Sequence, residues 1–159
     1  MQPPDQNRRR SAAAAIAIAL AAPAEGLRRV VYFDPPGIAT VCMGHTGPGL
    51  VKGKVYSLAE CDAFLTADMR KAVSIVDACV PGLPNNVLAA FSDAVFNMGP
   101  TIACNKSAST AARLLAEGKL MDACAQLSRW NLARIGGVLV PLPGLTKRRA
   151  EERVLCETP

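Results

Sequence analysis

The first apolar stretch of the chain is a run of small residues that follows three arginines. Positions 11–22 (SAAAAIAIALAA) carry no charge and no polar face. Positions 1–10 (MQPPDQNRRR) are polar and contain prolines, which predicts disorder. Twelve helical residues rise about 18 Å, well short of the roughly 30 Å hydrocarbon core of a bilayer. The pattern indicates a weakly hydrophobic targeting segment over 11–24, whose arginines favour a cytoplasmic N-terminus.

Two fates of this segment stay open. Ala19-Leu20-Ala21 fits a small-x-small cleavage site, as in a secretory signal peptide. Cleavage there would leave Glu25 only a few residues from a frayed new terminus, whereas a catalytic carboxylate needs a rigid support. If Glu25 is catalytic, the segment is better retained as the first helix of the fold, where it can carry Glu25.

A β-hairpin is predicted directly after this segment. Positions 28–33 (RRVVYF) are rich in β-branched and aromatic residues, which is typical of a strand. Positions 34–37 (DPPG) form a turn, and 38–43 (IATVCM) read as the return strand. A tight loop follows over 44–49 (GHTGPG).

The rest of the chain has helical periodicity. Ser57-Leu58-Ala59-Glu60 is a capping box that opens a helix running to about Ala78. Positions 87–98 carry few charges, so they are predicted to form the central buried helix. Further helices are expected over 109–117, 120–130 and 146–156, with a loop over 135–144. This order predicts an α+β fold, mostly helical, in which the N-terminal hairpin forms one wall of a cleft.

Composition narrows the class of protein. The chain has 159 residues, half of them hydrophobic, which suits one domain with its own core. The net charge of +5 suits an anionic partner, but no basic run is interleaved with aromatics, so nucleic-acid binding is not expected. Six cysteines without a C-x-x-C spacing, beside one histidine, argue against a zinc site. The even count favours disulfides and an oxidising compartment over buried free thiols, with the connectivity left open.

Candidate chemistry lies at Glu25, Asp34 and Thr40. Two carboxylates on opposed elements can cleave a glycosidic bond, one as an acid and the other as an anion. The apolar residues before Glu25 favour its protonated form, whereas Asp34 beside a turn suits the ionised partner. Thr40 can hold a water through its hydroxyl group. On this spacing alone, solvated surface acids are the more common explanation.

Further motifs favour a catalytic site over solvated surface acids. Glu25, Asp34 and Thr40, followed by GHTG at 44–47, closely resemble the catalytic motif of the phage lysozymes, glycoside hydrolase family 24. The resemblance continues to about position 156 through FNMG at 96–99, LSRW at 127–130, PGL at 143–145, RR at 148–149 and EE at 151–152.

This resemblance implies a lysozyme-like catalytic domain over 25–159, an endolysin for host cell lysis. Such an enzyme hydrolyses the β-1,4 bond between N-acetylmuramic acid and N-acetylglucosamine in peptidoglycan. Glu25 would be the general acid, and Asp34 and Thr40 would place the attacking water. Two alternatives are a lytic transglycosylase, which has no use for Asp34, and an inactive membrane-tethered protein that binds peptidoglycan.

The front of the chain resembles the signal-arrest-release subgroup of endolysins, although positions 11–24 are shorter than usual and lack glycines. This resemblance implies transient tethering to the inner membrane through 11–24 and release into the periplasm. We expect a monomer that needs no metal or organic cofactor. By resemblance, the expected disulfides are Cys42–Cys61, Cys79–Cys104 and Cys124–Cys156.

Other polar residues are assigned structural roles. His45, the only histidine, is expected to hold the hairpin loop against the helical part by hydrogen bonding. Arg148, Arg149 and Arg153 are expected on a solvated helix face, where they could also attract an anionic wall polymer. Trp130 is expected in the core.

Overall fold

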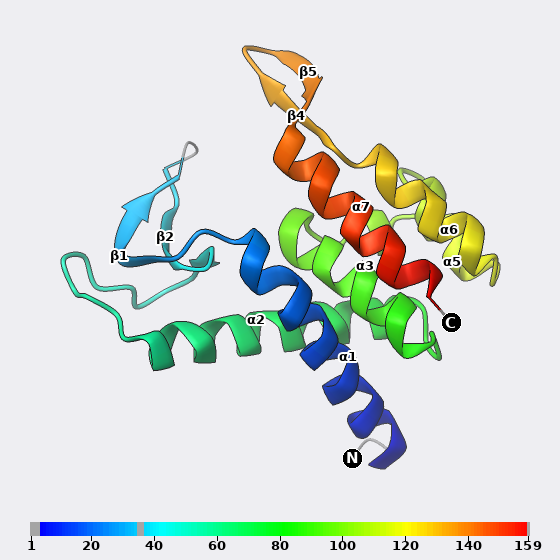
Figure 1. Ribbon diagram of the computed structural model, residues 1–159, viewed down its shortest axis with the longest axis horizontal. Coiled ribbons are helices and arrows are strands. Elements are labelled where there is room, and N and C mark those ends of the chain that lie inside the picture. Colours follow the sequence, from blue (N-terminus) through cyan, green and yellow to red (C-terminus); the bar gives the residue numbers. More distant parts are fainter. Residues whose placement is uncertain (1–3, 35–36, 159) are drawn as a thin grey trace.

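The molecule has a small sheet lobe and a larger helical lobe, joined by a long helix (Figure 1). The structure is a computed structural model that describes residues 4–34 and 37–158. The joining helix is α2 (Leu58–Cys79). The sheet lobe holds strands β1 (Arg28–Phe33), β2 (Ala39–Cys42) and β3 (His45–Thr46), antiparallel in that order. The helical lobe holds α1 (Pro4–Ala24), α3 (Asn85–Met98), α4 (Thr101–Cys104), α5 (Thr110–Ala116), α6 (Leu120–Gln126), the 3-10 helix η1 (Leu127–Arg129) and α7 (Pro143–Glu157). The predicted α+β class, mostly helical with an N-terminal hairpin, is confirmed.

The beginning of α1 departs from the sequence prediction. Positions 1–10 were expected to be disordered; positions 1–3 lie outside the described residues, but the chain is helical from Pro4 onward, so the prediction is wrong there. The cause is Asp77 of α2, whose side chain is fully buried. Its carboxylate accepts hydrogen bonds from Gln6 at 3.0 Å and Arg10 at 2.6 Å, and it also pairs with Arg9. These contacts order a polar segment because a buried carboxylate needs partners.

The alanine-rich part of α1 belongs to the core. Ala13, Ala14, Ala17 and Ala21 are buried against α2 and α3, where their small side chains let the helices approach closely. Within the described part of the chain, no helix is both long and apolar enough to span a bilayer. The prediction that this segment can serve as the first helix of the fold therefore agrees with its packing.

Helix α3 is the central helix, as its few charges predicted. Every residue from Val87 to Val95 is buried, and α1, α2 and α7 pack around it. One charged residue, Asp93, lies within this buried stretch with no exposed side-chain surface. The capping box at the beginning of α2 is also confirmed, since Ser57 and Glu60 exchange both of its hydrogen bonds.

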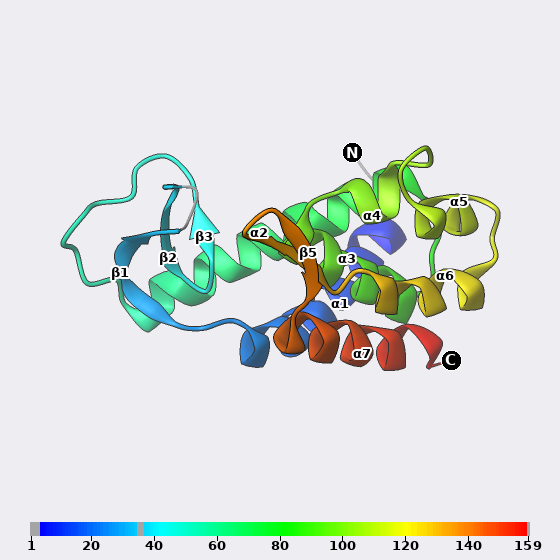
Figure 2. The same cartoon turned by 90° about the horizontal axis from the view of Figure 1, so that it is seen from above.

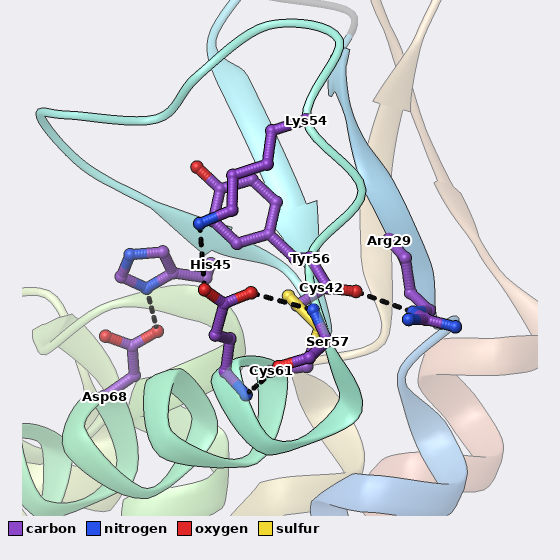
Figure 3. Close-up of a disulfide and its surroundings, with 9 residues drawn as sticks. Arg29, Cys42, His45, Lys54, Tyr56, Ser57, Cys61 and Asp68 are labelled. Carbon is purple, nitrogen blue, oxygen red and sulfur yellow. Dashed lines mark hydrogen bonds and ion pairs between the residues drawn. A yellow bond between two sulfur atoms is a disulfide. The ribbon is translucent and has the colours of Figure 1, made fainter.

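The sheet lobe has its own small core beneath the hairpin (Figure 3). The Cys42–Cys61 disulfide joins β2 to α2 there, and Val41 and Tyr56 pack beside it. The His45 ring stacks on Phe64 at 4.0 Å between centroids, and its Nδ1 lies 2.7 Å from Asp68. The role predicted for His45 is confirmed, because both partners belong to α2. The other two disulfides also match the expected pairs, Cys79–Cys104 and Cys124–Cys156.

A second hairpin lies where a loop was predicted over 135–144, and it begins a few residues earlier. Strands β4 (Leu132–Ile135) and β5 (Val138–Pro141) pair around Gly136-Gly137, and the hairpin projects from the helical lobe (Figures 1 and 2). Both glycines have positive φ, as the central residues of a type I′ two-residue turn require. The glycine pair between two apolar runs was the overlooked signal. Helix α7 accordingly begins at Pro143 rather than Thr146. Trp130 packs against the main core, as expected.

Candidate active site

Glu25 stands directly after the last residue of α1. Its backbone N–H donates to the Ala21 carbonyl at 3.1 Å, so the position is anchored by the last turn of the helix. Because α1 is packed into the core, this carboxylate has a rigid support. Its side chain keeps 20% of its surface exposed, which leaves it accessible to a ligand.

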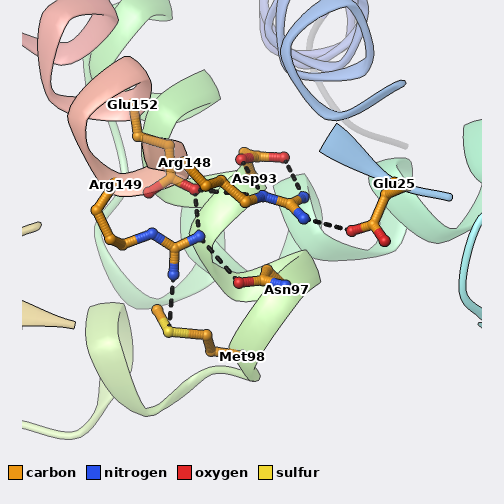
Figure 4. A network of polar contacts seen from close by, with 7 residues as sticks. All are labelled: Glu25, Asp93, Asn97, Met98, Arg148, Arg149 and Glu152. Atoms are coloured by element: carbon orange, nitrogen blue, oxygen red, sulfur yellow. Dashed lines mark hydrogen bonds and ion pairs between the residues drawn. The ribbon is translucent and has the colours of Figure 1, made fainter. Parts of the chain in front are cut away.

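Arg148 of α7 holds Glu25 in place (Figure 4). Its Nη1 donates to Glu25 Oε1, while its Nε and Nη2 form a fork with the two oxygens of Asp93, at 3.0 and 2.8 Å. Burial alone would lower the pKa of Arg148, but the hydrogen bonds with Asp93 and Glu25 raise it above its ordinary value. The guanidinium is therefore a permanent positive link between the centre of α3 and Glu25.

A second buried layer lies behind Arg148. Arg149 donates to Glu152 Oε1 at 2.6 Å, to Asn97 at 3.0 Å and to the sulfur of Met98 at 2.7 Å. The side chains of Arg149 and Glu152 have no exposed surface. The prediction that Arg148 and Arg149 lie on a solvated helix face is therefore wrong. Asp93, in the buried centre of α3, required a cation, and Arg148 supplies it.

The two oxygens of Glu25 have different surroundings. Oε1 accepts from Arg148, whereas Oε2 faces Gly44, in the turn between β2 and β3. A Cβ atom added at Gly44 would lie 3.6 Å from Oε2. A proton carried by Glu25 therefore belongs on Oε2, because an oxygen bound to a guanidinium is an acceptor.

A groove extends to both sides of Glu25. One part, of about 480 Å³, lies between the end of α1 and the beginning of α7 and is lined by Glu25, Asn97 and Arg148 among others. Another part, of about 240 Å³, is lined by Gly44, α2 and the end of α3, including Phe96 and Gly99. Glu25 lines the first part and Gly44 the second, and a Cβ atom at Gly44 would lie 3.6 Å from Glu25 Oε2, so the two parts lie near each other. The FNMG segment borders both. A groove with a carboxyl group partway along it suits an extended polymer.

Asp34 and Thr40 each hydrogen-bond to the backbone of Ile38 in the hairpin, not to Glu25. Asp34 Oδ1 accepts from the Ile38 N–H at 2.7 Å, and the Thr40 hydroxyl donates to the Ile38 carbonyl at 3.0 Å. Thr40 is buried on the middle strand, paired with Tyr32 and Thr46. Within the described residues, neither side chain hydrogen-bonds to Glu25 or lines its part of the groove. Their assignment to the reaction stays a prediction.

Sequence reasoning missed Asp93, Arg148 and Glu152 as site residues. One signal was available: Asp93 is a lone acid in an otherwise apolar helix, and such a carboxylate needs a buried cation. A second signal was the pair Arg148-Arg149 followed by Glu152, at the i,i+3 and i,i+4 spacings that bring helical side chains together.

Replacing Gly44 by alanine should lower kcat about tenfold, because the added methyl group would lie in van der Waals contact with Glu25 Oε2 and would keep water or substrate away from that oxygen. Gly44 also has a φ of +78°, so alanine should cost about 1 kcal/mol of folding free energy. Gly53→Ala is the matched control: its φ is +84°, with no heavy atom within 4 Å of the added Cβ. Steady-state kinetics should show the loss for Gly44→Ala alone. An equal loss in both variants would mean that backbone strain is the cause.

The chain resembles known proteins in both sequence and fold. A sequence model of the phage lysozyme family matches residues 22–152. A protein named SAR-endolysin from Bacteriophage PS119 is 37% identical over 133 residues, 83% of this chain and 75% of that protein. The muramidase domain of SpmX from Asticaccaulis excentricus superposes with a TM-score of 0.79 at 28% identity, over 90% of this chain and 95% of that one. The active form of the P1 phage endolysin Lyz gives 0.74 at 26% identity, over 89% and 82%.

Proposed function

Because the chain belongs to the phage lysozyme family, we propose that this endolysin hydrolyses the β-1,4 bond between N-acetylmuramic acid and N-acetylglucosamine, with Glu25 as general acid. The observation that carries the proposal is the environment of Glu25. One oxygen is bound by a buried arginine, and the other faces the groove at Gly44. Lysozyme activity and a peptidoglycan substrate agree with the family and with the muramidase neighbours.

In the proposed reaction, Glu25 acts on the leaving group, whereas Asp34 and Thr40 act on the attacking water. Glu25 Oε2 gives its proton to the glycosidic oxygen, the bond from that oxygen to the sugar C1 breaks, and a water adds to C1. Asp34 and Thr40 would position that water, and the Asp34 carboxylate would accept its proton. Both side chains hydrogen-bond to the backbone of Ile38, and this supports the role because it fixes the two side chains relative to each other. We expect the enzyme to act as a monomer.

The test is the clearing of outer-membrane-permeabilised cells. Glu25→Gln removes the proton but keeps the shape, so its rate should be about a hundred- to ten-thousand-fold below wild type. Equal rates would refute Glu25 as the acid. Absence of clearing by both proteins would favour the alternative of an inactive, membrane-tethered peptidoglycan-binding protein. Mass spectrometry of the products separates hydrolysis from the lytic transglycosylase alternative, which would yield 1,6-anhydro ends.

We further propose that the enzyme acts in the periplasm and keeps residues 11–24. Relatives named SAR-endolysin support export, and the buried alanines of α1 support retention, because cleavage after Ala21 would remove core residues. Fractionation and N-terminal sequencing of the active protein test both points. An active protein that begins at Ala22 would refute retention.

A further inference from the structure

The β4–β5 hairpin carries apolar side chains that face solvent. It projects from the helical lobe, and no other helix or strand among the described residues packs extensively on it (Figures 1 and 2). Exposed apolar side chains gathered on one projecting element are typical of a contact with a partner or a membrane. The large apolar side chains exposed here are those of Leu132, Ile135, Val138 and Leu139.

The charged residues in and around the hairpin are positive. The sequence has no acidic residue between Asp122 and Glu151, but it has five cationic ones. Two of these five, at positions 148 and 149, are buried behind Glu25. The three that are exposed are Arg129, Arg134 and Lys147. Lys147 lies 4.0 Å from Glu151, at the outer limit of an ion pair, so the two arginines are the cations that favour an anionic partner.

The tip of the hairpin combines an apolar pair with a cation. Ile135 pairs with Val138 across the two-glycine turn, and Arg134 pairs with Leu139 one position further from the turn. Directly opposite residues share a face and successive residues alternate, so Ile135 and Val138 lie on one face and Arg134 on the other. Arg134 Nη1 donates to the Gly137 carbonyl at 2.8 Å, which holds the guanidinium beside the turn.

A phospholipid surface with anionic headgroups fits this tip in both dimensions and charge. Each strand has four residues and spans about 13 Å, whereas interfacial segments enter a bilayer by about 5–10 Å. A nucleic acid or a wall polymer would use the cations but leave Ile135 and Val138 in water. A second copy of the chain would cover the apolar pair, but it would bring the like charges of two hairpins together.

We propose that the β4–β5 hairpin is a membrane-contact element, in which Ile135 and Val138 enter an anionic phospholipid surface while Arg134 binds a headgroup phosphate. This contact is separate from α1, whose alanines are buried in the core. Leu142, directly after β5, lines the groove beside Glu25, so the contact would keep the active site near the membrane surface. The proposed periplasmic location decides which bilayer the enzyme meets, but vesicle binding is measured without lytic activity.

Co-sedimentation of the full-length protein with vesicles tests the proposal. Wild type should bind vesicles containing phosphatidylglycerol more tightly than vesicles of phosphatidylcholine alone, and added salt should weaken the difference. Ile135→Ser combined with Val138→Ser should weaken binding to the anionic vesicles at least about tenfold, because two apolar side chains no longer leave water. Arg134→Gln should weaken binding about fivefold, and only on the anionic vesicles.

Met121→Ser combined with Val154→Ser is the matched control. These side chains are exposed to 54% and 68%, against 56% and 62% for Ile135 and Val138, but they lie on α6 and α7. The control should bind vesicles as wild type does. All the variants should hydrolyse lipid-free peptidoglycan at the wild-type rate, because the substituted side chains lie outside the groove beside Glu25.

Four results would overturn the proposal. Equal binding by wild type and the Ile135→Ser/Val138→Ser variant would place the lipid contact elsewhere, for example in α1. Absence of wild-type binding to both kinds of vesicle would mean that the hairpin contacts no lipid. A wild-type dimer that dissociates in this variant, measured by sedimentation velocity, would make the hairpin an interface between copies. Slower hydrolysis of lipid-free peptidoglycan by the same variant would assign the hairpin to substrate binding.

Folding and activity do not confuse these results. If the Ile135→Ser/Val138→Ser variant does not fold, Arg134→Gln still decides, because equal binding of wild type and Arg134→Gln to the anionic vesicles would refute the headgroup contact. If wild type binds the vesicles but has no lytic activity, the proposed function fails, whereas the membrane contact stands.

Discussion

Removal of residues 1–10 is expected to lower the free energy of unfolding by about 3–5 kcal/mol, the usual cost of leaving a buried charge without its partner. The deletion removes Gln6, Arg9 and Arg10, all of which bond to the buried carboxylate of Asp77. Burial alone would raise the pKa of Asp77, but Arg10, Gln6 and Arg9 outweigh it and hold the pKa below its ordinary value of 3.8. The intact chain should therefore lose the part of its free energy of unfolding that comes from ionised Asp77 as pH falls below about 3.8. Denaturant unfolding of the two proteins measures the difference.

A second substitution tests whether the buried charge of Asp77 causes this loss of stability. Asp77→Asn should destabilise the full-length protein but stabilise the truncated one, because a neutral amide costs less to bury without an arginine. Arg8→Ala, at an exposed position of the same helix, is the control for loss of positive charge and should have little effect. If the truncated protein unfolds at the wild-type denaturant concentration, the segment before Ser11 contributes nothing to the fold.

Arg148→Met should reduce kcat about a hundredfold, because a catalytic group that shifts by about 1 Å loses that much. The substitution frees Glu25 Oε1 and leaves the Asp93 carboxylate buried without a cation, so the free energy of unfolding should also fall by about 3–5 kcal/mol. Arg148→Lys keeps the charge without the two-nitrogen fork, so an intermediate loss is expected. Clearing rates per folded molecule and denaturant unfolding measure the two effects.

A double substitution separates stability from catalysis in the same region. Asp93→Asn combined with Arg148→Met removes the uncompensated charge, so it should regain most of the lost folding free energy without regaining activity. Arg153→Met, on the exposed side of α7 with 41% of its side chain accessible, is the matched control. Full activity in Arg148→Met would mean that Glu25 does not depend on this contact.

The parts of the fold that the sequence predicted correctly are those that depend on local patterns of residues. The capping box at Ser57, the first hairpin and the apolar character of α3 depend on neighbouring residues alone. The disulfide pairs followed from resemblance to a family, since many connectivities satisfy the same sequence. Asp34 and Thr40 were also assigned by resemblance, and their roles stay predictions.

The parts that could not be predicted are long-range polar contacts. Asp77 and Asp93 are single acids within apolar helical stretches, which signals that each needs a cation. The sequence does not say which cation, because Arg9 lies 68 positions from Asp77, and Arg148 lies 55 from Asp93. Periodicity placed the arginines on helices but could not decide between a solvated face and a buried one. Only the tertiary arrangement of α1, α2, α3 and α7 brings the pairs together.

The positions of the cysteines divide the chain into a cross-linked part and a part without covalent ties. The three disulfides join β2 to α2, α2 to α4 and α6 to α7, so the cross-links begin at Cys42. Cross-links restrict the unfolded chain between the residues they join. Helix α1 and Glu25 precede the first of them and are held by packing, hydrogen bonds and ion pairs alone. On heating, the carboxylate can therefore leave its position while the cross-linked frame persists, so loss of activity would precede loss of the fold.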